Sequence, residues 1–124
     1  MKNLNEQTFK QDVIDLEDND DGTKSWIFKG ERPAIIDFYA DWCAPCKMLT
    51  PILEELEKDF KHKIDFYKVD TDAEPVLAKM FQIQSVPSIL LVSTEEDSTP
   101  QMILGAIPRE GLLQAIEKEF GLTL

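Results

Sequence analysis

Residues 33–40, with the sequence PAIIDFYA, form an almost continuous apolar run that only Asp37 interrupts with a charge. A strand with apolar side chains on both faces has to be covered on both sides, usually by helices. The run therefore predicts a strand in the middle of a layered α/β fold, in which a sheet lies between helices.

The remaining sequence alternates between strand and helix patterns. A short strand is expected near Lys2–Leu4, and Asn5 can cap a helix whose apolar positions are Phe9, Val13, Ile14 and Leu16. Further helices are expected over residues 43–60, 74–81 and 108–120, and further strands over residues 64–69, 87–92 and 101–104, with a hairpin turn at 94–100. This β-α-β-α-β-α-β-β-α order predicts one α/β domain over residues 1–124, with a mixed sheet whose closing hairpin is antiparallel.

The chain is strongly acidic. Of its 124 residues, 13 are Lys or Arg and 24 are Asp or Glu, which gives a net charge of −11. Nucleic acids and anionic membrane surfaces are bound through clustered Lys and Arg, so neither is an expected partner. No apolar run approaches the roughly 20 residues that span a bilayer, and residues 1–10 lack the apolar stretch of a secretory signal. We therefore expect a cytoplasmic protein, or a periplasmic one whose signal has been removed.

Residues 17–22, EDNDDG, form an acidic cluster that ends in a turn dipeptide. A solvated loop is the simpler interpretation. A calcium-binding loop is the alternative, but the regular ligand spacing and the closing Glu of an EF-hand are absent. Trp26 and Phe28, which follow this cluster, are expected to form a packing patch.

Cys43 and Cys46 stand three residues apart where the predicted central strand gives way to a helix. Unpaired N–H groups at a helix N-terminus stabilise an anion, so the thiolate of Cys43 is favoured. Cys46 lies one turn further along, close enough to form a disulfide and more shielded. This asymmetry predicts that Cys43 attacks a substrate disulfide and that Cys46 then resolves the mixed disulfide. Pro45 stiffens the start of the helix at a position where no N–H is lost.

Two other interpretations of the cysteine pair remain open. A structural disulfide that closes so short a loop would add little stability. A zinc site needs about four ligands, and the chain has no second Cys or His pair. Its one histidine, His62, is expected to be a surface turn residue, so no metal is predicted.

Asp37 is expected to be buried, because it lies inside the apolar run, six residues before Cys43. A buried carboxyl group has a raised pKa, and near a dithiol it could accept a proton from Cys46 and later return it. Lys68, on the neighbouring predicted strand, is the expected charge partner of Asp37; a plain surface lysine is the alternative.

Val86 and Pro87 precede the third predicted core strand. Proline is tolerated at the start of a strand, but a cis bond here would bring the loop to the dithiol and expose the backbone of Val86 to a substrate. The residues alone do not distinguish cis from trans. Trp42, next to Cys43, is expected to be a partly exposed platform.

Residues 37–47, DFYADWCAPCK, resemble the active-site segment of the thioredoxin family, in particular bacterial members, and the match continues through Pro51. Residues 67–70, YKVD, resemble the central strand of that family, residues 83–88, IQSVPS, its cis-proline loop, and Gly105 with Ala106 its glycine turn beside the substrate surface. The resemblance covers about residues 31–120.

The resemblance implies a thioredoxin-like fold, with a central mixed sheet of five strands and four flanking helices. It also implies that protein disulfides are reduced, that the proton relay of Asp37 and the cis bond at Val86–Pro87 are real, and that a flavin-dependent thioredoxin reductase that uses NADPH restores the dithiol. The substrate surface would comprise Trp42, Ala44, Pro45, Val86, Pro87 and Gly105. No bound cofactor is expected beyond the redox-active disulfide of Cys43 and Cys46, and we expect a monomer.

Three positions depart from the family pattern. Ala44 replaces the usual glycine before Pro45, which predicts a modest change in reducing power. Ser85 stands where a glycine is common, and residues 18–32 form a longer segment than usual, as in some bacterial relatives that include exported ones. Two alternatives to a cytoplasmic reductase of client proteins therefore stay open: an exported reductase or isomerase, and a binding subunit that uses the fold without catalysis.

Overall fold

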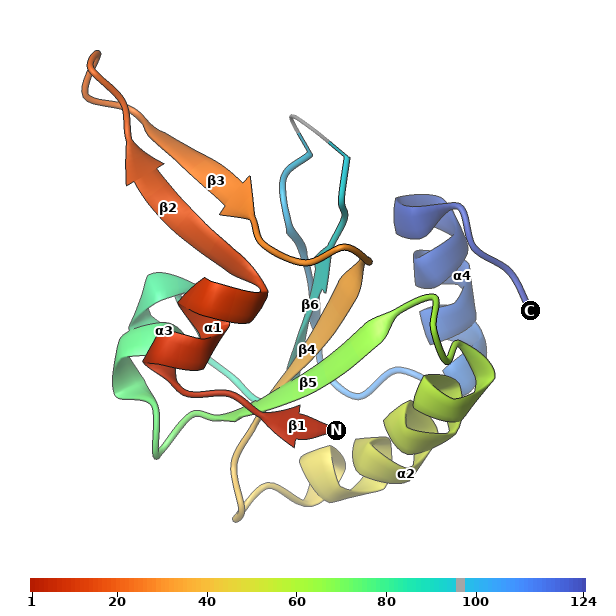
Figure 1. The fold of residues 1–124 in the computed structure, drawn as a ribbon. Coiled ribbons are helices and arrows are strands. Elements are labelled where there is room, and N and C mark those ends of the chain that lie inside the picture. The colour runs from red at the N-terminus through yellow and green to blue at the C-terminus, as the bar shows by residue number, and fades with distance from the viewer. Residues whose placement is uncertain (96–97) are drawn as a thin grey trace.

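The computed structural model describes residues 1–95 and 98–124. Its main sheet has five strands in the order β1-β5-β4-β6-β7 (Figure 1). The strands are β1 (Lys2–Asn3), β4 (Ala34–Tyr39), β5 (Asp65–Asp70), β6 (Ser88–Val92) and β7 (Gln101–Leu104). The apolar run at residues 33–40 contains β4, the strand at the centre of this sheet, as the sequence predicts.

The sheet is mixed, as the sequence predicts. β1 and β4 both run parallel to β5, whereas β6 is antiparallel to both β4 and β7. In this register Asp37 of β4 lies beside Lys68 of β5 on one side and Ile89 of β6 on the other. The charged pair proposed from the sequence is therefore adjacent in the sheet.

Four helices cover the two faces of the sheet (Figure 1). They are α1 (Glu6–Asp12), α2 (Ala44–Asp59), α3 (Pro75–Met80) and α4 (Arg109–Phe120). Side chains of α1 and α3 share one buried cluster with Ile36 and Phe38 of β4, and side chains of α2 and α4 share another with Ile35. Alternate residues of β4 thus enter opposite cores, which explains why nearly the whole strand is apolar.

The first helix is shorter than predicted, and two strands follow it that the sequence analysis did not expect. Helix α1 ends at Asp12, and β2 (Ile14–Asp18) pairs antiparallel with β3 (Lys24–Phe28) in a separate sheet. Val13 and Ile14 are buried as expected, but not on a helix. In so short a segment, apolar spacing does not separate a helix from a strand that starts beside it.

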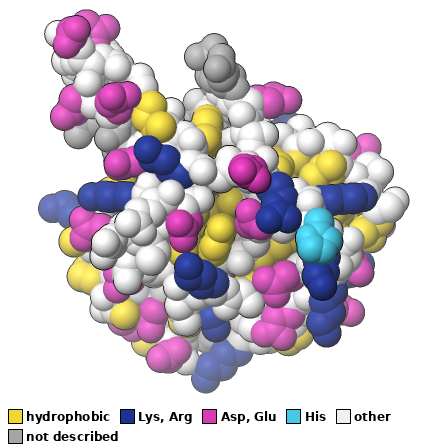
Figure 2. All heavy atoms as spheres, in the orientation of Figure 1, with side chains coloured by type: hydrophobic (Ala, Val, Ile, Leu, Met, Phe, Trp, Pro, Cys, Tyr) yellow, Lys and Arg dark blue, Asp and Glu magenta, His cyan; other side chains and the backbone are white. Residues whose placement is uncertain are grey.

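The β2–β3 hairpin extends beyond the sheet (Figure 1), and acidic side chains gather at its tip (Figure 2). Trp26 and Phe28 of β3 form the packing patch that the sequence predicts. The rings of Trp26 and Phe81 stack with centroids 5.7 Å apart, and Phe28 packs against the same core. Gly22 has a φ of +85° in the turn, where glycine is favoured. The acidic cluster is therefore the end of a hairpin, and within the described ranges no group of three or more candidate ligands could hold a metal ion.

Part of the turn predicted over 94–100 lies outside the described residues, at positions 96 and 97. Among the helices that the structure describes, none combines the length and the apolar character needed to cross a membrane.

Candidate active site

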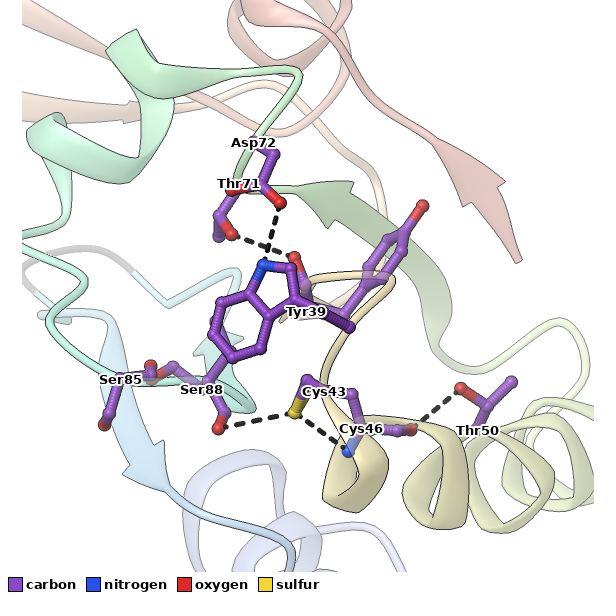
Figure 3. The surroundings of a disulfide bond; sticks show 10 residues. Tyr39, Cys43, Cys46, Thr50, Thr71, Asp72, Ser85 and Ser88 are labelled. Carbon is purple, nitrogen blue, oxygen red and sulfur yellow. Dashed lines mark hydrogen bonds between the residues drawn. A yellow bond between two sulfur atoms is a disulfide. The ribbon is translucent and has the colours of Figure 1, made fainter.

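The two cysteines lie where β4 leads into α2. Cys43 is the N-cap of α2, Pro45 lies in the first turn, and Cys43 and Cys46 form a disulfide with Cα atoms 5.3 Å apart. The backbone N–H of Cys46 donates a hydrogen bond to Sγ of Cys43 over 3.2 Å (Figure 3). Sγ of Cys43 therefore occupies the place where a helix N-terminus stabilises negative charge.

The expected difference in shielding between the two cysteines is small in this oxidised form. Cys43 is 4 % exposed and Cys46 is 2 % exposed. Both belong to a buried cluster with Ala40, against which Tyr39 and Val86 pack. Ala44 and Pro45 between them are exposed, so the dipeptide borders solvent beside the disulfide.

The loop before β6 faces the disulfide. The Val86–Pro87 bond is cis, and the carbonyl oxygen of Val86 lies 3.6 Å from Sγ of Cys43. The hydroxyl of Ser88 donates to the carbonyl of Ser85 over 2.8 Å, and the N–H of Gly105 donates to the carbonyl of Pro87 over 2.9 Å. Two hydrogen bonds from separate segments thus fix the loop that places Val86 beside Cys43.

Trp42 forms the exposed platform that the sequence predicts. Its side chain is 73 % exposed, and its indole N–H donates to Oδ2 of Asp72 over 3.0 Å (Figure 3). Asp72 lies in the loop after β5, whose Thr71 also donates two hydrogen bonds to the carbonyl of Tyr39. The platform is thereby tied to the sheet while its ring remains open to solvent.

Asp37 is buried, with 1 % of its surface exposed. Burial raises the pKa of Asp37 from its ordinary value of 3.8 to about 7, although the charge of Lys68 acts in the opposite direction. Its Oδ1 accepts no hydrogen bond from any residue that the structure describes. A carboxyl group in this state can hold or release a proton near neutral pH, which is what a proton relay requires.

Lys68 is half-buried beside Asp37. Its Nζ lies 5.7 Å from the centroid of the Tyr39 ring, a distance typical of a cation–π contact. The hydroxyl of Tyr39 in turn donates to Oδ1 of Asn3 over 3.0 Å, and burial raises the pKa of Tyr39. Lys68 is therefore held over the sheet rather than extended into solvent, which argues against a plain surface role.

Several residues in these contacts were missed by sequence reasoning, among them Tyr39, Asp72 and Ser88. Tyr39 and Asp72 carry no signal of their own, because a tyrosine in an apolar run and an aspartate in a polar loop are both ordinary. Ser88 did offer one, since it is the only polar residue of the buried strand β6. Buried hydroxyl groups usually have a hydrogen-bond partner, and that partner here is the loop beside Cys43.

Replacing Gly105 by alanine is expected to destabilise the protein by about 1 kcal/mol. Gly105 has a φ of +88°, which an L-residue adopts only under strain, although a Cβ at this position would meet open space. The free energy of unfolding can be measured in urea. Gly111→Ala is the matched control, because Gly111 lies inside α4, where alanine favours the helix and meets only the flexible side chain of Ile107. Equal stability of the two variants would contradict the prediction.

Comparison with known proteins gives a consistent result. The thioredoxin family profile matches residues 1–118. A thioredoxin from Borreliella burgdorferi is 43 % identical over 118 residues, which cover 95 % of this chain and 96 % of that protein. An M-type chloroplastic thioredoxin from Spinacia oleracea is 38 % identical over 100 residues, which cover 81 % of this chain but 54 % of the relative, so the chain spans about half of that protein.

A similar solved structure is described as "Crystal structure of chloroplastic thioredoxin z defines a novel type-specific target recognition". It has a TM-score of 0.77 to this chain at 19 % sequence identity, and the match covers 95 % of this chain and 92 % of the other. At that identity the likeness concerns the fold. It confirms the arrangement of a five-stranded mixed sheet with four helices.

Proposed function

This chain belongs to the thioredoxin family and is a thiol–disulfide oxidoreductase, and from that premise we propose how its residues reduce the disulfides of client proteins. The observation that carries the proposal is the hydrogen bond from the N–H of Cys46 to Sγ of Cys43 at the N-cap of α2. A donor already aimed at this sulfur favours its thiolate once the pair is reduced.

The reaction is a two-electron exchange between two dithiol–disulfide pairs. The thiolate of Cys43 attacks one sulfur of the client disulfide, forms a mixed disulfide and releases the other client sulfur as a thiolate. The thiolate of Cys46 then attacks Sγ of Cys43, which breaks the mixed disulfide and releases the second client thiolate. The client gains two electrons, and Cys43 and Cys46 end as the disulfide present in this structure.

Asp37 has the role of proton acceptor in the second step. Cys46 must lose a proton to become nucleophilic, and a carboxyl group with a pKa of about 7 can accept it at neutral pH. Lys68 moderates that pKa, since its charge lowers what burial raises. The role of Asp37 rests on its burial and on its position in the sheet, and the stability and client reduction of Asp37→Asn test it.

A client segment would lie on the surface around the disulfide. Val86 offers backbone groups beside Cys43 for strand-like pairing, and Trp42 offers an exposed apolar ring. Ala44 and Pro45 border the disulfide between the two cysteines, and Pro87 and Gly105 shape the loop opposite. This surface would bind the main-chain groups and the apolar side chains of a client. Such contacts do not depend on one particular sequence, which suits a reductase of many different clients.

We further propose that the protein acts as a monomer in the cytoplasm and that a flavin-dependent reductase using NADPH restores its dithiol. The similar thioredoxins support thioredoxin chemistry. The electron donor distinguishes this proposal from the alternative, an exported reductase or isomerase that receives its electrons from a membrane donor.

The reduction potential of the Cys43–Cys46 pair tests this choice. Equilibration against dithiothreitol or glutathione is expected to give a strongly reducing value, and a bacterial flavin thioredoxin reductase is expected to reduce the protein with NADPH. Ala44→Gly serves as the matched variant and is expected to shift the potential by less than about 30 mV, or about 1.4 kcal/mol. A markedly oxidising potential together with no turnover by the reductase would favour the exported isomerase instead.

A further inference from the structure

Tyr39 is the last residue of β4, and it has no part in the reaction proposed above. Side chains alternate between the two faces of a strand, so Tyr39 points to the same face of the sheet as Asp37. Its side chain packs against the buried cluster that contains Cys43 and Cys46, and its ring extends away from the disulfide (Figure 3). Tyr39 thus borders the reacting pair on the face of the sheet that carries the proposed proton acceptor.

The side chain of Tyr39 crosses the neighbouring strand. Its hydroxyl donates a hydrogen bond to Oδ1 of Asn3 over 3.0 Å. Asn3 belongs to β1, and β5 lies between β1 and β4 in the sheet. Neighbouring strands are about 4.8 Å apart, so a side chain from β4 reaches β1 only by spanning the whole width of β5. Tyr39 and Asn3 therefore form a strap over β5, which is held at one end by the backbone of β4 and at the other by this hydrogen bond.

Lys68 lies under the strap. In the register of the sheet it is the partner of Asn3 on one side and of Asp37 on the other. Its Nζ lies 5.7 Å from the centroid of the Tyr39 ring, and no residue that the structure describes forms a hydrogen bond or an ion pair with this ammonium group. A lysine side chain is long and flexible, so without the ring the ammonium group is free to extend into solvent.

The position of this ammonium group affects Asp37. Burial raises the pKa of Asp37, and the charge of Lys68 lowers it. The other neighbouring strand presents Ile89 to Asp37, and the buried side chains of α2 and α4, which cover this face, are apolar except for Cys46. Among the described neighbours of Asp37, Lys68 is therefore the source of positive charge.

The strap does not change its own charge in the pH range where Asp37 titrates. Burial, and then the charges of Asp70 and Asp41, raise the pKa of the Tyr39 hydroxyl. The hydroxyl therefore keeps its proton near neutral pH and continues to donate to Asn3. The ring stays over β5 whether Asp37 carries a proton or not.

We propose that Tyr39 is a positioning residue of the thiol–disulfide exchange: anchored on Asn3, its ring holds the ammonium group of Lys68 beside the proton acceptor. This inference rests on the proposed function, in which Asp37 accepts the proton that the thiol of Cys46 loses. When the strap is cut, the ammonium group moves toward solvent and Asp37 holds its proton up to a higher pH. The second step then needs a higher pH to reach half of its full rate.

Tyr39→Phe and Asn3→Ala test this inference, because each removes one partner of the hydrogen bond that anchors the ring. Phenylalanine keeps the ring and so the burial of Asp37, and Asn3 is exposed, so alanine there leaves the core intact. The NMR signal of the Asp37 carboxyl carbon, followed against pH in the full chain, gives the midpoint of its titration. Both variants are expected to raise this midpoint by at least about 0.3 in pH.

Tyr67→Phe is the matched control. Tyr67 precedes Lys68 on β5, so its side chain points to the opposite face of the sheet and packs against the other core. This control is expected to leave the midpoint within about 0.1 in pH of the wild type. Lys68→Met removes the charge and keeps a long side chain, and is expected to raise the midpoint more than either strap variant. Adding Tyr39→Phe to Lys68→Met is expected to cause no further rise, because the ring acts through Lys68.

The rate of the second step separates positioning from a purely structural role. Release of the client thiol in a single turnover, measured at a series of pH values, gives the pH of half-maximal rate. In Tyr39→Phe this pH is expected to rise together with the Asp37 titration. A lower rate at every pH, with an unchanged pH of half-maximal rate, would show that Tyr39 only supports the fold and would overturn the proposal.

Three results of the NMR titration would also overturn it. They are an unchanged midpoint in both strap variants, an equal rise in Tyr67→Phe, and a full further rise when Tyr39→Phe is added to Lys68→Met. Failure of the proposed proton transfer gives a different result. In that case the wild-type rate does not follow the titration of Asp37, while the NMR midpoints still report whether the strap positions Lys68.

Discussion

Cys43→Ser is expected to reduce insulin turnover by dithiothreitol to the rate of dithiothreitol alone. A serine at the N-cap keeps a side-chain acceptor for the N–H of Cys46, so α2 should still form, but its hydroxyl cannot attack a disulfide at neutral pH. The measurement is the time course of insulin precipitation. Full activity of this variant would remove the catalytic role of Cys43 and favour a binding subunit of the same fold.

Cys46→Ser is the matched control, because it removes the other sulfur of the same pair. The nucleophile Cys43 remains, so this variant is expected to attack once and then accumulate as a mixed disulfide with its client. Mass spectrometry without reductant would detect the adduct, and dithiothreitol would release it. If Cys43→Ser forms the adduct and Cys46→Ser does not, the assignment of nucleophile and resolving cysteine is reversed.

Asp37→Asn is expected to stabilise the oxidised protein by up to about 4 kcal/mol at pH 8, and to have almost no effect near pH 4. The pKa of Asp37 rises from 3.8 to about 7 on folding because the carboxyl group is buried. The folded state therefore binds a proton more tightly than the unfolded state, so this group's contribution to stability is fully present below pH 4 and is lost as the pH rises through 7. A shift of that size is worth about 4 kcal/mol.

Urea unfolding at a series of pH values measures this difference. Asp41→Asn is the control, since Asp41 is exposed and four residues away, and its stability should follow the wild type at every pH. Client reduction should become slower in Asp37→Asn at the step carried out by Cys46, because the amide cannot accept a proton. A loss of stability at pH 8 would show that the carboxylate is solvated or paired, and the relay proposal would lose its basis.

The central part of the fold could be predicted because its sequence patterns are unambiguous. β4 and β6 are too apolar for any environment except the middle of a covered sheet, and Pro75 and Pro108 mark where helices begin. The mixed character of the sheet followed from the last two strands, which are close enough in sequence to form a hairpin.

The β2–β3 hairpin was missed although a signal was present. Ile14 and Leu16 alternate with acidic residues, and Asp21-Gly22 is a common hairpin turn between two such segments. The spacing of Phe9 and Val13 favoured a helix that continues through this segment. The helical period and the strand period fit so few apolar residues equally well. In the structure the hairpin packs through Trp26 on Phe81. This contact joins residues far apart in the sequence, so no local pattern predicts it.

For the candidate site, the sequence indicated the residues proposed to react but not the residues that hydrogen-bond around them. Cys43 and Cys46 are recognisable from spacing, and Asp37 from a charge inside an apolar strand. The hydrogen bonds from Trp42 to Asp72 and from Ser88 to Ser85 join segments whose approach depends on the assembled sheet. The sequence alone could therefore propose the reacting groups, but it could not predict the contacts around them.

The main sheet ends in short strands on both sides. β1 contributes two residues at one edge and β7 contributes four at the other, whereas the apolar strands β4 and β6 lie inside. A long, flat edge would be a template for pairing with another chain, the step from which amyloid-like fibres grow. Segments as apolar as β4 would support such fibres if they were exposed. Their interior position, between edges too short to extend the sheet, protects the protein against fibre growth.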